Sequence, residues 1–136
     1  MNEIEILLID DNAHDIQMTR ETLSQNKLRN NLNIVSNVSD AKAFLKGEVY
    51  VPQPDLILLD SYFSQNMEQS IFNALKTDER LCNVPLVILT AVGIKPELLS
   101  YNVPPIGFVN KPLDFIQFID VIKRVKSFRV AIVTSL

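Results

Sequence analysis

Short runs of apolar residues recur along the chain and alternate with longer segments of helical period. The apolar runs lie at Ile4–Ile9, Leu32–Val35, Leu56–Leu59, Leu86–Leu89 and Ile106–Val109. Three of them show no polar alternation, which is typical of strands buried on both faces of a parallel sheet. Helical spacing is clearest in the stripe formed by Phe115, Phe118, Ile119, Ile122 and Val125. The alternation predicts five βα units.

Residues that favour helix ends stand between the runs. Asn12, with Asp15 three residues later, predicts the start of the first helix. Ser39 or Asp40 is expected to begin the second, and Gly47 to end it. A third helix is predicted from the stripe Met67, Ile71 and Leu75, and a short fourth from Pro96.

Chain length then limits the architecture. The 136 residues are 47% hydrophobic, enough for one core and too few for two ordinary domains. We expect an α/β domain over residues 1–126, with a flavodoxin-like, doubly wound, five-stranded parallel sheet of order 2-1-3-4-5 and helices on both faces. Residues 127–136 form an apolar tail, expected to be an extra strand or a dimerisation arm.

Charge and composition narrow the class of partner and the compartment. The net charge is -3 with scattered Lys and Arg, so no basic stripe indicates nucleic acid or a membrane surface. The start Met1-Asn2-Glu3 lacks the basic region of a signal peptide, and no apolar run approaches a membrane span of about 20 residues. Cys82 has no cysteine to pair with. We expect a cytoplasmic protein.

Polar residues follow the predicted strands at their carboxyl ends, where sites in such sheets lie. Asp10 and Asp11 follow the first strand, Asp60 the third, Thr90-Ala91 the fourth, and Lys111-Pro112 comes just after the fifth. Clustered carboxylates repel one another unless a cation lies among them, and hard oxygen ligands favour Mg²⁺. A metal and a Lys together suit phosphoryl transfer, with Asp60 as the candidate nucleophile. Each motif alone also fits a helix-capping acid or a turn.

The set Asp10, Asp11, Asp60, Thr90 and Lys111, with a Pro after the Lys, resembles the signature of response-regulator receiver domains of two-component signalling. The resemblance covers residues 4–126. It implies that Asp60 is the phosphoacceptor, that Asp11 ligates Mg²⁺ directly, and that Asp10 helps to hold the metal. Lys111 would pair with the phosphoryl group.

The resemblance also implies a switch. Thr90 would move to hydrogen-bond the phosphoryl group, Ala91 would offer a backbone N–H, and Phe108 would stand at the aromatic position that turns inward on activation. The Lys111–Pro112 peptide bond is usually cis in the family. The backbone carbonyl of Tyr62 would be a further metal ligand.

More narrowly, three stretches are similar to the small regulators that partner phytochrome-type histidine kinases: Ile6–Leu23, Leu75–Thr90 and Lys111–Phe128. About ten residues remain after the fifth helix, too few for a DNA-binding or catalytic output domain. The expected output is therefore phosphorylation-dependent binding of another protein, or relay to a histidine phosphotransfer protein. We do not expect the chain to be a turnover enzyme. Its expected partner is a sensor histidine kinase, and a homodimer is one possible assembly.

The loop after Asp60 departs from the family pattern. Receivers usually carry a Met-Pro or Leu-Pro pair and then a Gly, whereas this chain reads Ser61-Tyr62-Phe63-Ser64-Gln65. A degenerate receiver that acts as a constitutive interaction domain therefore remains an alternative. An aspartyl-nucleophile phosphatase would need an acid where Tyr62 stands. A flavin-binding module would not place an acidic pair at its phosphate loop.

Overall fold

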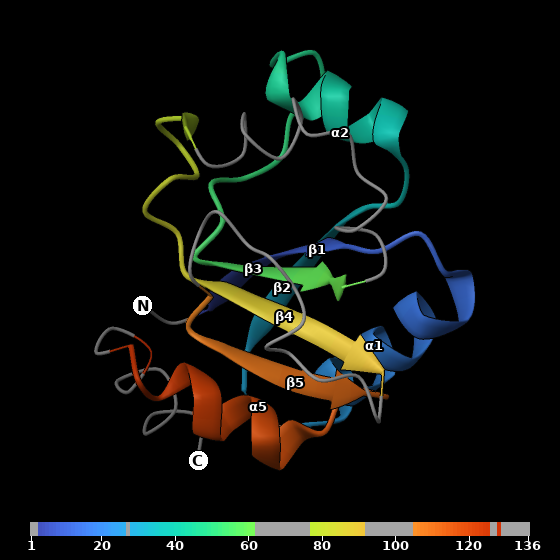
Figure 1. Cartoon of the computed structure of the whole chain (residues 1–136), viewed down its shortest axis with the longest axis vertical. Helices are drawn as coiled ribbons and strands as arrows, with labels where there is room; N and C mark the ends of the chain where they lie inside the picture. Colours follow the sequence, from blue (N-terminus) through green and yellow to red (C-terminus); the bar gives the residue numbers. More distant parts are fainter. Residues whose placement is uncertain (1–2, 27, 62–76, 92–104, 126–127, 129–136) are drawn as a thin grey trace.

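Parallel strands form the centre of the molecule in a computed structural model that describes residues 3–26, 28–61, 77–91, 105–125 and 128 (Figure 1). The five strands pair in the order β2-β1-β3-β4-β5, and every pairing is parallel. The elements are β1 (Ile4–Ile9), α1 (Ala13–Gln25), β2 (Asn30–Val35), α2 (Val38–Leu45), β3 (Leu56–Asp60), β4 (Leu86–Ala91), β5 (Gly107–Lys111) and α5 (Phe115–Ile122). The predicted fold class and strand order are confirmed.

The continuous apolar runs are explained by burial on both faces of the sheet. In β1, Ile4, Ile6 and Leu8 point into one hydrophobic cluster, whereas Leu7 and Ile9 point into another. The same alternation recurs in β3 and β4, since successive side chains of a strand point to opposite faces. With both faces covered, no position of these runs has to be polar.

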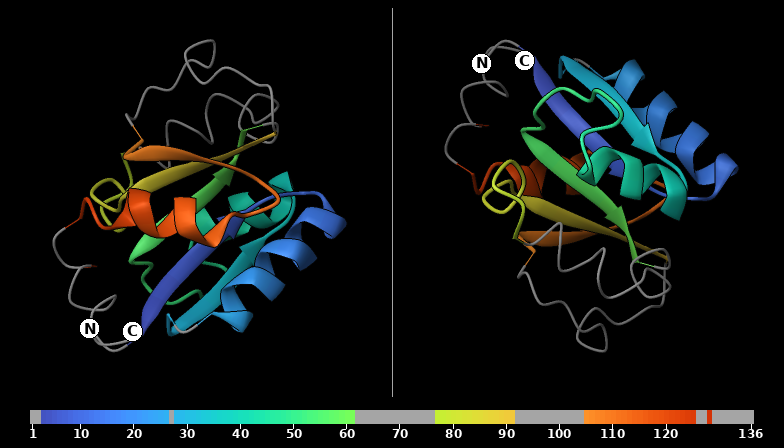
Figure 2. Two further views of the ribbon diagram at one scale, coloured as in Figure 1. Left: turned by 90° about the horizontal axis from the view of Figure 1, so that it is seen from below. Right: turned by 90° about the horizontal axis from the view of Figure 1, so that it is seen from above.

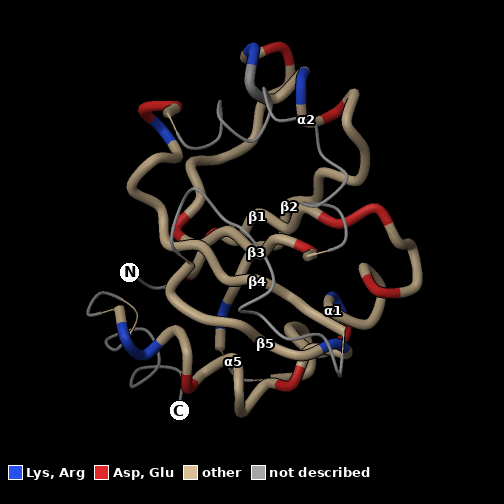
Figure 3. The backbone as a smooth tube through the Cα atoms, in the orientation of Figure 1, with Lys and Arg blue, Asp and Glu red and all other residues tan. Residues whose placement is uncertain are grey.

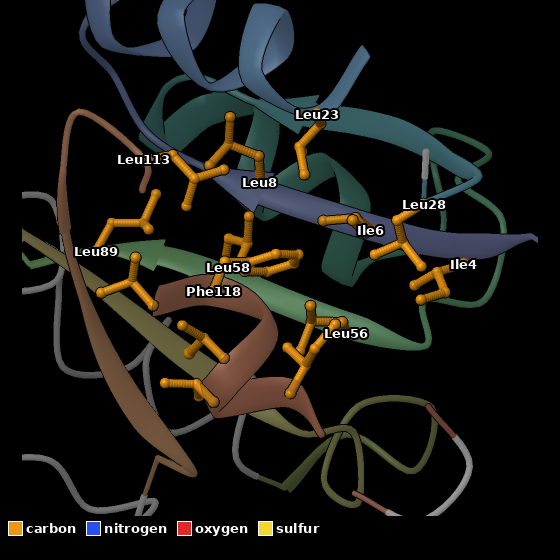
Figure 4. Close-up of a cluster of buried hydrophobic side chains, with 14 of the residues drawn as sticks. Ile4, Ile6, Leu8, Leu23, Leu28, Leu56, Leu58, Leu89, Leu113 and Phe118 are labelled. Atoms are coloured by element: carbon orange, nitrogen blue, oxygen red, sulfur yellow. The ribbon is translucent and has the colours of Figure 1, made fainter. Parts of the chain in front are cut away.

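Helices cover the two faces unequally in the described part of the chain. Leu23 of α1 and Phe118 of α5 belong to the cluster drawn in Figure 4, so these two helices share one face. Ala41 and Phe44 of α2 belong to the cluster on the opposite face. Figure 2 shows this layering from two sides. The arrangement leaves the carboxyl ends of the strands at one edge.

The edge strand β2 begins earlier than its apolar run suggested. It starts at Asn30, which pairs with Ile4, two residues before the predicted start. Asn31 and Asn33 each donate a side-chain hydrogen bond to the Glu5 carboxylate of β1, at 2.9 and 3.3 Å. Because cross-strand hydrogen bonds satisfy these polar side chains, an asparagine-rich segment can be a strand.

The helix-end predictions are confirmed in α1 and partly wrong in α2. The Asn12 side chain accepts a hydrogen bond from the Asp15 backbone N–H at 2.9 Å, as predicted. The second helix is capped by Asn37 rather than by Ser39 or Asp40, and Asn37 accepts from the Asp40 N–H at 2.7 Å. The capping residue is therefore the one three positions before the acid, as in α1.

Gly47 ends α2 as predicted. Its φ of 74° lies in the left-handed region, and Glu48 N–H donates to the Ala43 carbonyl at 2.9 Å. This pattern of a left-handed residue followed by a return hydrogen bond is a Schellman motif.

Other sequence predictions lie outside the described residues, including the third helix around Ile71, the fourth helix after Pro96, and the tail from 129 to 136. Phe128, just beyond the predicted domain boundary at 126, is described and is 1% exposed within the cluster of α1 and α5. None of the helices in the described ranges combines the length and the apolar character that crossing a bilayer would require.

Candidate functional site

Four strands deliver polar residues to the same edge of the sheet. Asp10 directly follows β1 and Asp60 is the last residue of β3. Thr90 is the last but one residue of β4, before Ala91, and Lys111 is the last residue of β5. The strand register holds these residues at similar heights along the sheet, since Asp60 pairs with Leu89 and Ala91 pairs with Lys111. Figure 3 shows acidic segments after β1 and at the end of β3, and a basic segment at the end of β5, on the same side of the molecule.

Asp10, Asp11 and Asp60 form a compact acidic cluster. Each offers a carboxylate oxygen, and these oxygens lie within 4.8 Å of one another. Asp10 is 0% exposed and Asp60 3% exposed, whereas Asp11 is exposed. Burial raises the pKa of Asp10 above its usual value, and the charge of Asp60 adds to that rise. The predicted convergence of the three acids is therefore observed.

The two oxygens of Asp10 differ in their surroundings. Oδ1 accepts a hydrogen bond from the Asn12 backbone N–H at 3.0 Å. Oδ2 lies 3.2 Å from the Lys111 ammonium but accepts no hydrogen bond from the described residues. A buried carboxylate oxygen without a donor is costly, and a cation would satisfy it.

Lys111 lies at the centre of the acids. Its Nζ is 2.5 Å from Asp60 Oδ1 and 2.8 Å from Asp15 Oδ2, and its side chain is 14% exposed. Burial alone would lower the pKa of Lys111, but hydrogen bonds to Asp15 and Asp60 and the charges of Asp10 and Asp60 outweigh it and raise that pKa. The side chain is therefore an ammonium ion at neutral pH.

The other predicted site residues that the structure describes belong to β4, to β5 and to the residue after β5. Thr90 is buried, and its hydroxyl donates to the Ala91 carbonyl at a long 3.4 Å. Ala91 is exposed, and Phe108 is partly buried against the cluster under α2. The Lys111–Pro112 peptide bond is cis. Tyr62 lies outside the described residues.

Sequence reasoning missed Asp15 as a site residue. It was assigned only to the start of α1, yet its carboxylate bonds to a Lys that is 96 positions away. A signal was present, because the first turn of the helix after β1 starts at the carboxyl edge of the sheet. The pairing with Lys111 was not predicted because the two residues lie far apart in the sequence.

The donor set fits a hard divalent cation. Three carboxylates can supply oxygens to one point, and the exposed Asp11 leaves a side open to water. Among the described residues, the buried Asp10 Oδ2 has only the Lys111 ammonium, at 3.2 Å, as a nearby positive charge. Mg²⁺ prefers such oxygen ligands and retains several waters. The arrangement places a nucleophilic carboxylate, an ammonium group and a cation-binding cluster in contact.

Known proteins resemble this chain in sequence and in fold. No family model matches the chain. Response regulator Rcp1 of Synechocystis sp. (strain ATCC 27184 / PCC 6803 / Kazusa) is 26% identical over 133 residues, which cover 95% of this chain and 90% of Rcp1. A solved structure of its Mn²⁺-bound form has the same fold, with a TM-score of 0.61 at 24% identity over 92% of this chain and 93% of that one.

Two further solved structures are similar. The bacteriophytochrome response regulator AtBRR has a TM-score of 0.73 at 26% identity, covering 90% of this chain and 92% of its own. The phosphorylated cyanobacterial phytochrome response regulator RcpA has a TM-score of 0.62 at 25% identity, covering 93% of both chains. By its fold, by the lysine at its acidic edge and by these likenesses, the chain is similar to response regulator receiver domains, and among them to phytochrome response regulators.

Proposed function

We propose that the chain accepts a phosphoryl group on the Asp60 carboxylate and signals through the change that follows. The observation that carries the proposal is the contact of the Lys111 ammonium with Asp60, 2.5 Å from Oδ1, beside the acidic cluster. A carboxylate in contact with an ammonium group and a cation site is equipped to attack phosphorus while the charge on the phosphoryl oxygens is neutralised.

The donor is a phosphohistidine of a sensor histidine kinase, of the phytochrome type by likeness to RcpA and AtBRR, or of a histidine phosphotransfer protein. An Asp60 oxygen attacks phosphorus, the P–N bond to the imidazole breaks, and the imidazole takes a proton from solvent. The product is an acyl phosphate on Asp60. Transfer occurs once per chain and is undone by hydrolysis, so the domain is not a turnover enzyme.

Asp10, Asp11, Asp60 and the backbone carbonyl of Tyr62 would hold Mg²⁺, which neutralises charge on the phosphoryl oxygens when bound. The carboxylates of this chain fit that ion, and the relative Rcp1 has been solved with Mn²⁺. Lys111 keeps its charge at neutral pH and holds a phosphoryl oxygen. Burial of Asp60 excludes competing water.

Thr90 would act as the switch. Its hydroxyl donates a long hydrogen bond to the Ala91 carbonyl, so a phosphoryl oxygen would be a better acceptor. Movement of Thr90 toward the acyl phosphate makes room for the Phe108 ring, and Ala91 offers its backbone N–H. Partners respond if they bind the two arrangements with different affinity. The output is binding of another protein, or relay of the phosphoryl group.

The test is phosphorylation by a small donor. The purified chain is incubated with acetyl phosphate and Mg²⁺, and intact mass is measured. We expect the mass of one phosphoryl group to appear, to be removed by hydroxylamine, and to depend on Mg²⁺. Asp60→Asn should abolish it, whereas Asp114→Asn, at an exposed helix cap, should leave it unchanged.

The rival function is that of a constitutive interaction domain, favoured by the unusual residues after Asp60. It predicts wild-type protein that never gains the phosphoryl mass with acetyl phosphate or with a cognate kinase. That result would overturn the phosphoacceptor proposal.

A further inference from the structure

Two helices of this protein begin with the same local motif, but their acids have different partners. In α1, Asn12 accepts from the Asp15 N–H, and in α2, Asn37 accepts from the Asp40 N–H. The Asp40 carboxylate then accepts from the side chain of its own Asn37 at 2.9 Å. The Asp15 carboxylate instead accepts from Lys111, on β5. Helix capping explains the backbone hydrogen bonds of both acids. It does not explain why the Asp15 carboxylate bonds to Lys111.

Asp15 also differs from the other two acids that contact Lys111. Asp10 and Asp60 belong to the acidic cluster suited to a cation, and Asp15 does not. A bound cation would engage the oxygens of Asp10 and Asp60, and phosphorylation would turn one oxygen of Asp60 into the bridging oxygen of an acyl phosphate, which removes the charge of that carboxylate. Of the three carboxylates around Lys111 in the described structure, Asp15 alone is left unchanged by those events.

We propose that Asp15 is a positioning residue that holds the Lys111 ammonium at the phosphoryl-accepting edge while Asp10 and Asp60 are engaged elsewhere. The inference rests on the proposed function and adds a residue to its machinery. Asp15 touches neither the phosphoryl group nor the metal. It acts through Lys111.

The physical reason is the flexibility of lysine. Its long side chain has many rotamers, and holding its ammonium group at one point costs conformational entropy each time an anion binds. Asp15 lies in the first turn of α1, where the Asn12 cap restrains its backbone, and its short side chain has fewer rotamers than lysine. Its carboxylate lies 2.8 Å from the Lys111 ammonium. A lysine already held in place loses less freedom when the phosphoryl group arrives.

The first test measures the rate of phosphorylation at saturating acetyl phosphate and Mg²⁺. We expect Asp15→Asn to lower the rate about tenfold, the loss expected when a charge-assisted hydrogen bond to the reacting assembly is removed. Asp15→Glu keeps the charge and should recover most of the rate. Asp40→Asn removes the matching acid from α2 and should leave the rate unchanged, which separates positioning from helix capping and from net charge.

The second test observes Lys111 directly, without phosphorylation. Nitrogen-15 spectra of the lysine ammonium groups should show a slowly exchanging Lys111 signal, assigned by its loss in Lys111→Met. That signal should broaden or vanish in Asp15→Asn and persist in Asp40→Asn. Persistence of the signal in Asp15→Asn would overturn the inference.

The outcomes separate the two proposals. A wild type that gains no phosphoryl group overturns the proposed function, and the positioning role falls with it. A wild type that is phosphorylated, together with an Asp15→Asn variant that reacts at the same rate or faster, overturns the Asp15 inference alone. A faster variant would mean that Asp15 competes with the phosphoryl group for Lys111.

Discussion

At the scale of single residues, the site holds more negative charge than its lysine can neutralise. Asp10 contributes a fully buried carboxylate whose pKa is raised by burial, and its Oδ2 accepts no hydrogen bond from the described residues. Lys111 also contacts Asp15 and Asp60, so its single charge faces three carboxylates. The metal-free state is therefore strained by repulsion in a way that a divalent cation relieves.

This imbalance predicts that Mg²⁺ stabilises the folded chain. A ligand at one hundred times its dissociation constant adds about 2.7 kcal/mol to the free energy of unfolding. Asp10→Asn should raise the metal-free stability by about 1–3 kcal/mol, because it removes a buried charge whose ammonium partner is shared with two other carboxylates. It should also reduce the gain on adding Mg²⁺. Thermal unfolding with Mg²⁺ and with a chelator measures both effects, with Asp114→Asn as the control for lost charge. A variant less stable than wild type without metal would contradict the account.

At the scale of elements, the sequence predicted the existence of the strands better than their ends. Runs such as Leu56–Leu59 are apolar because both faces are buried, so periodicity located them. The apolar runs ended before Asp60, Thr90 and Lys111. These residues belong to the strands because backbone hydrogen bonding between strands does not require an apolar side chain. For the same reason, apolar periodicity did not predict that β2 begins at the polar residue Asn30.

Close packing of α5 on β5 gives a prediction at this scale. A Cβ built on Gly107 would lie 2.6 Å from Val121 Cγ1, so the absence of a side chain lets the helix approach the strand. Gly107→Ala should destabilise the fold by about 1–3 kcal/mol through overpacking. Combined with Val121→Ala, it should cost less than the sum of the two single changes. Urea unfolding of all four proteins measures the coupling, and strict additivity would show that the contact does not limit the approach.

At the scale of the whole molecule, the fold brings together site residues that lie far apart in the sequence. The set Asp10, Asp11, Asp60 and Lys111 was predictable because each stands at a strand end and parallel strands share that edge. The position of Asp15 in the first turn after a strand was a weaker signal, since Asp40 has the same position after β2 but bonds to its own Asn37. Fold class followed from alternation and length, and the site followed from the fold.

Assembly is the prediction at this scale. We expect a homodimer formed by the apolar tail and the outer face of α5, where Ile116 is 83% exposed. Such interfaces bury roughly 800 Å² per partner. Because Phe128 is buried in the core, a truncation at 126 would damage the fold, and the informative variant ends at Phe128. Light scattering should show a dimer for the full chain, and a monomer for this truncation and for Ile116→Asp, with circular dichroism unchanged. A monomeric full chain at tens of micromolar would exclude the dimer.

The central claim, that Asp60 receives a phosphoryl group, is tested most directly by locating the modified residue. After reaction with acetyl phosphate and Mg²⁺, borohydride reduces an aspartyl phosphate to homoserine, and peptide sequencing finds its position. The account predicts homoserine at position 60 alone, at a level that falls when Mg²⁺ is withheld. Homoserine at position 10 or 11, or none in a sample whose fold is intact, would contradict it.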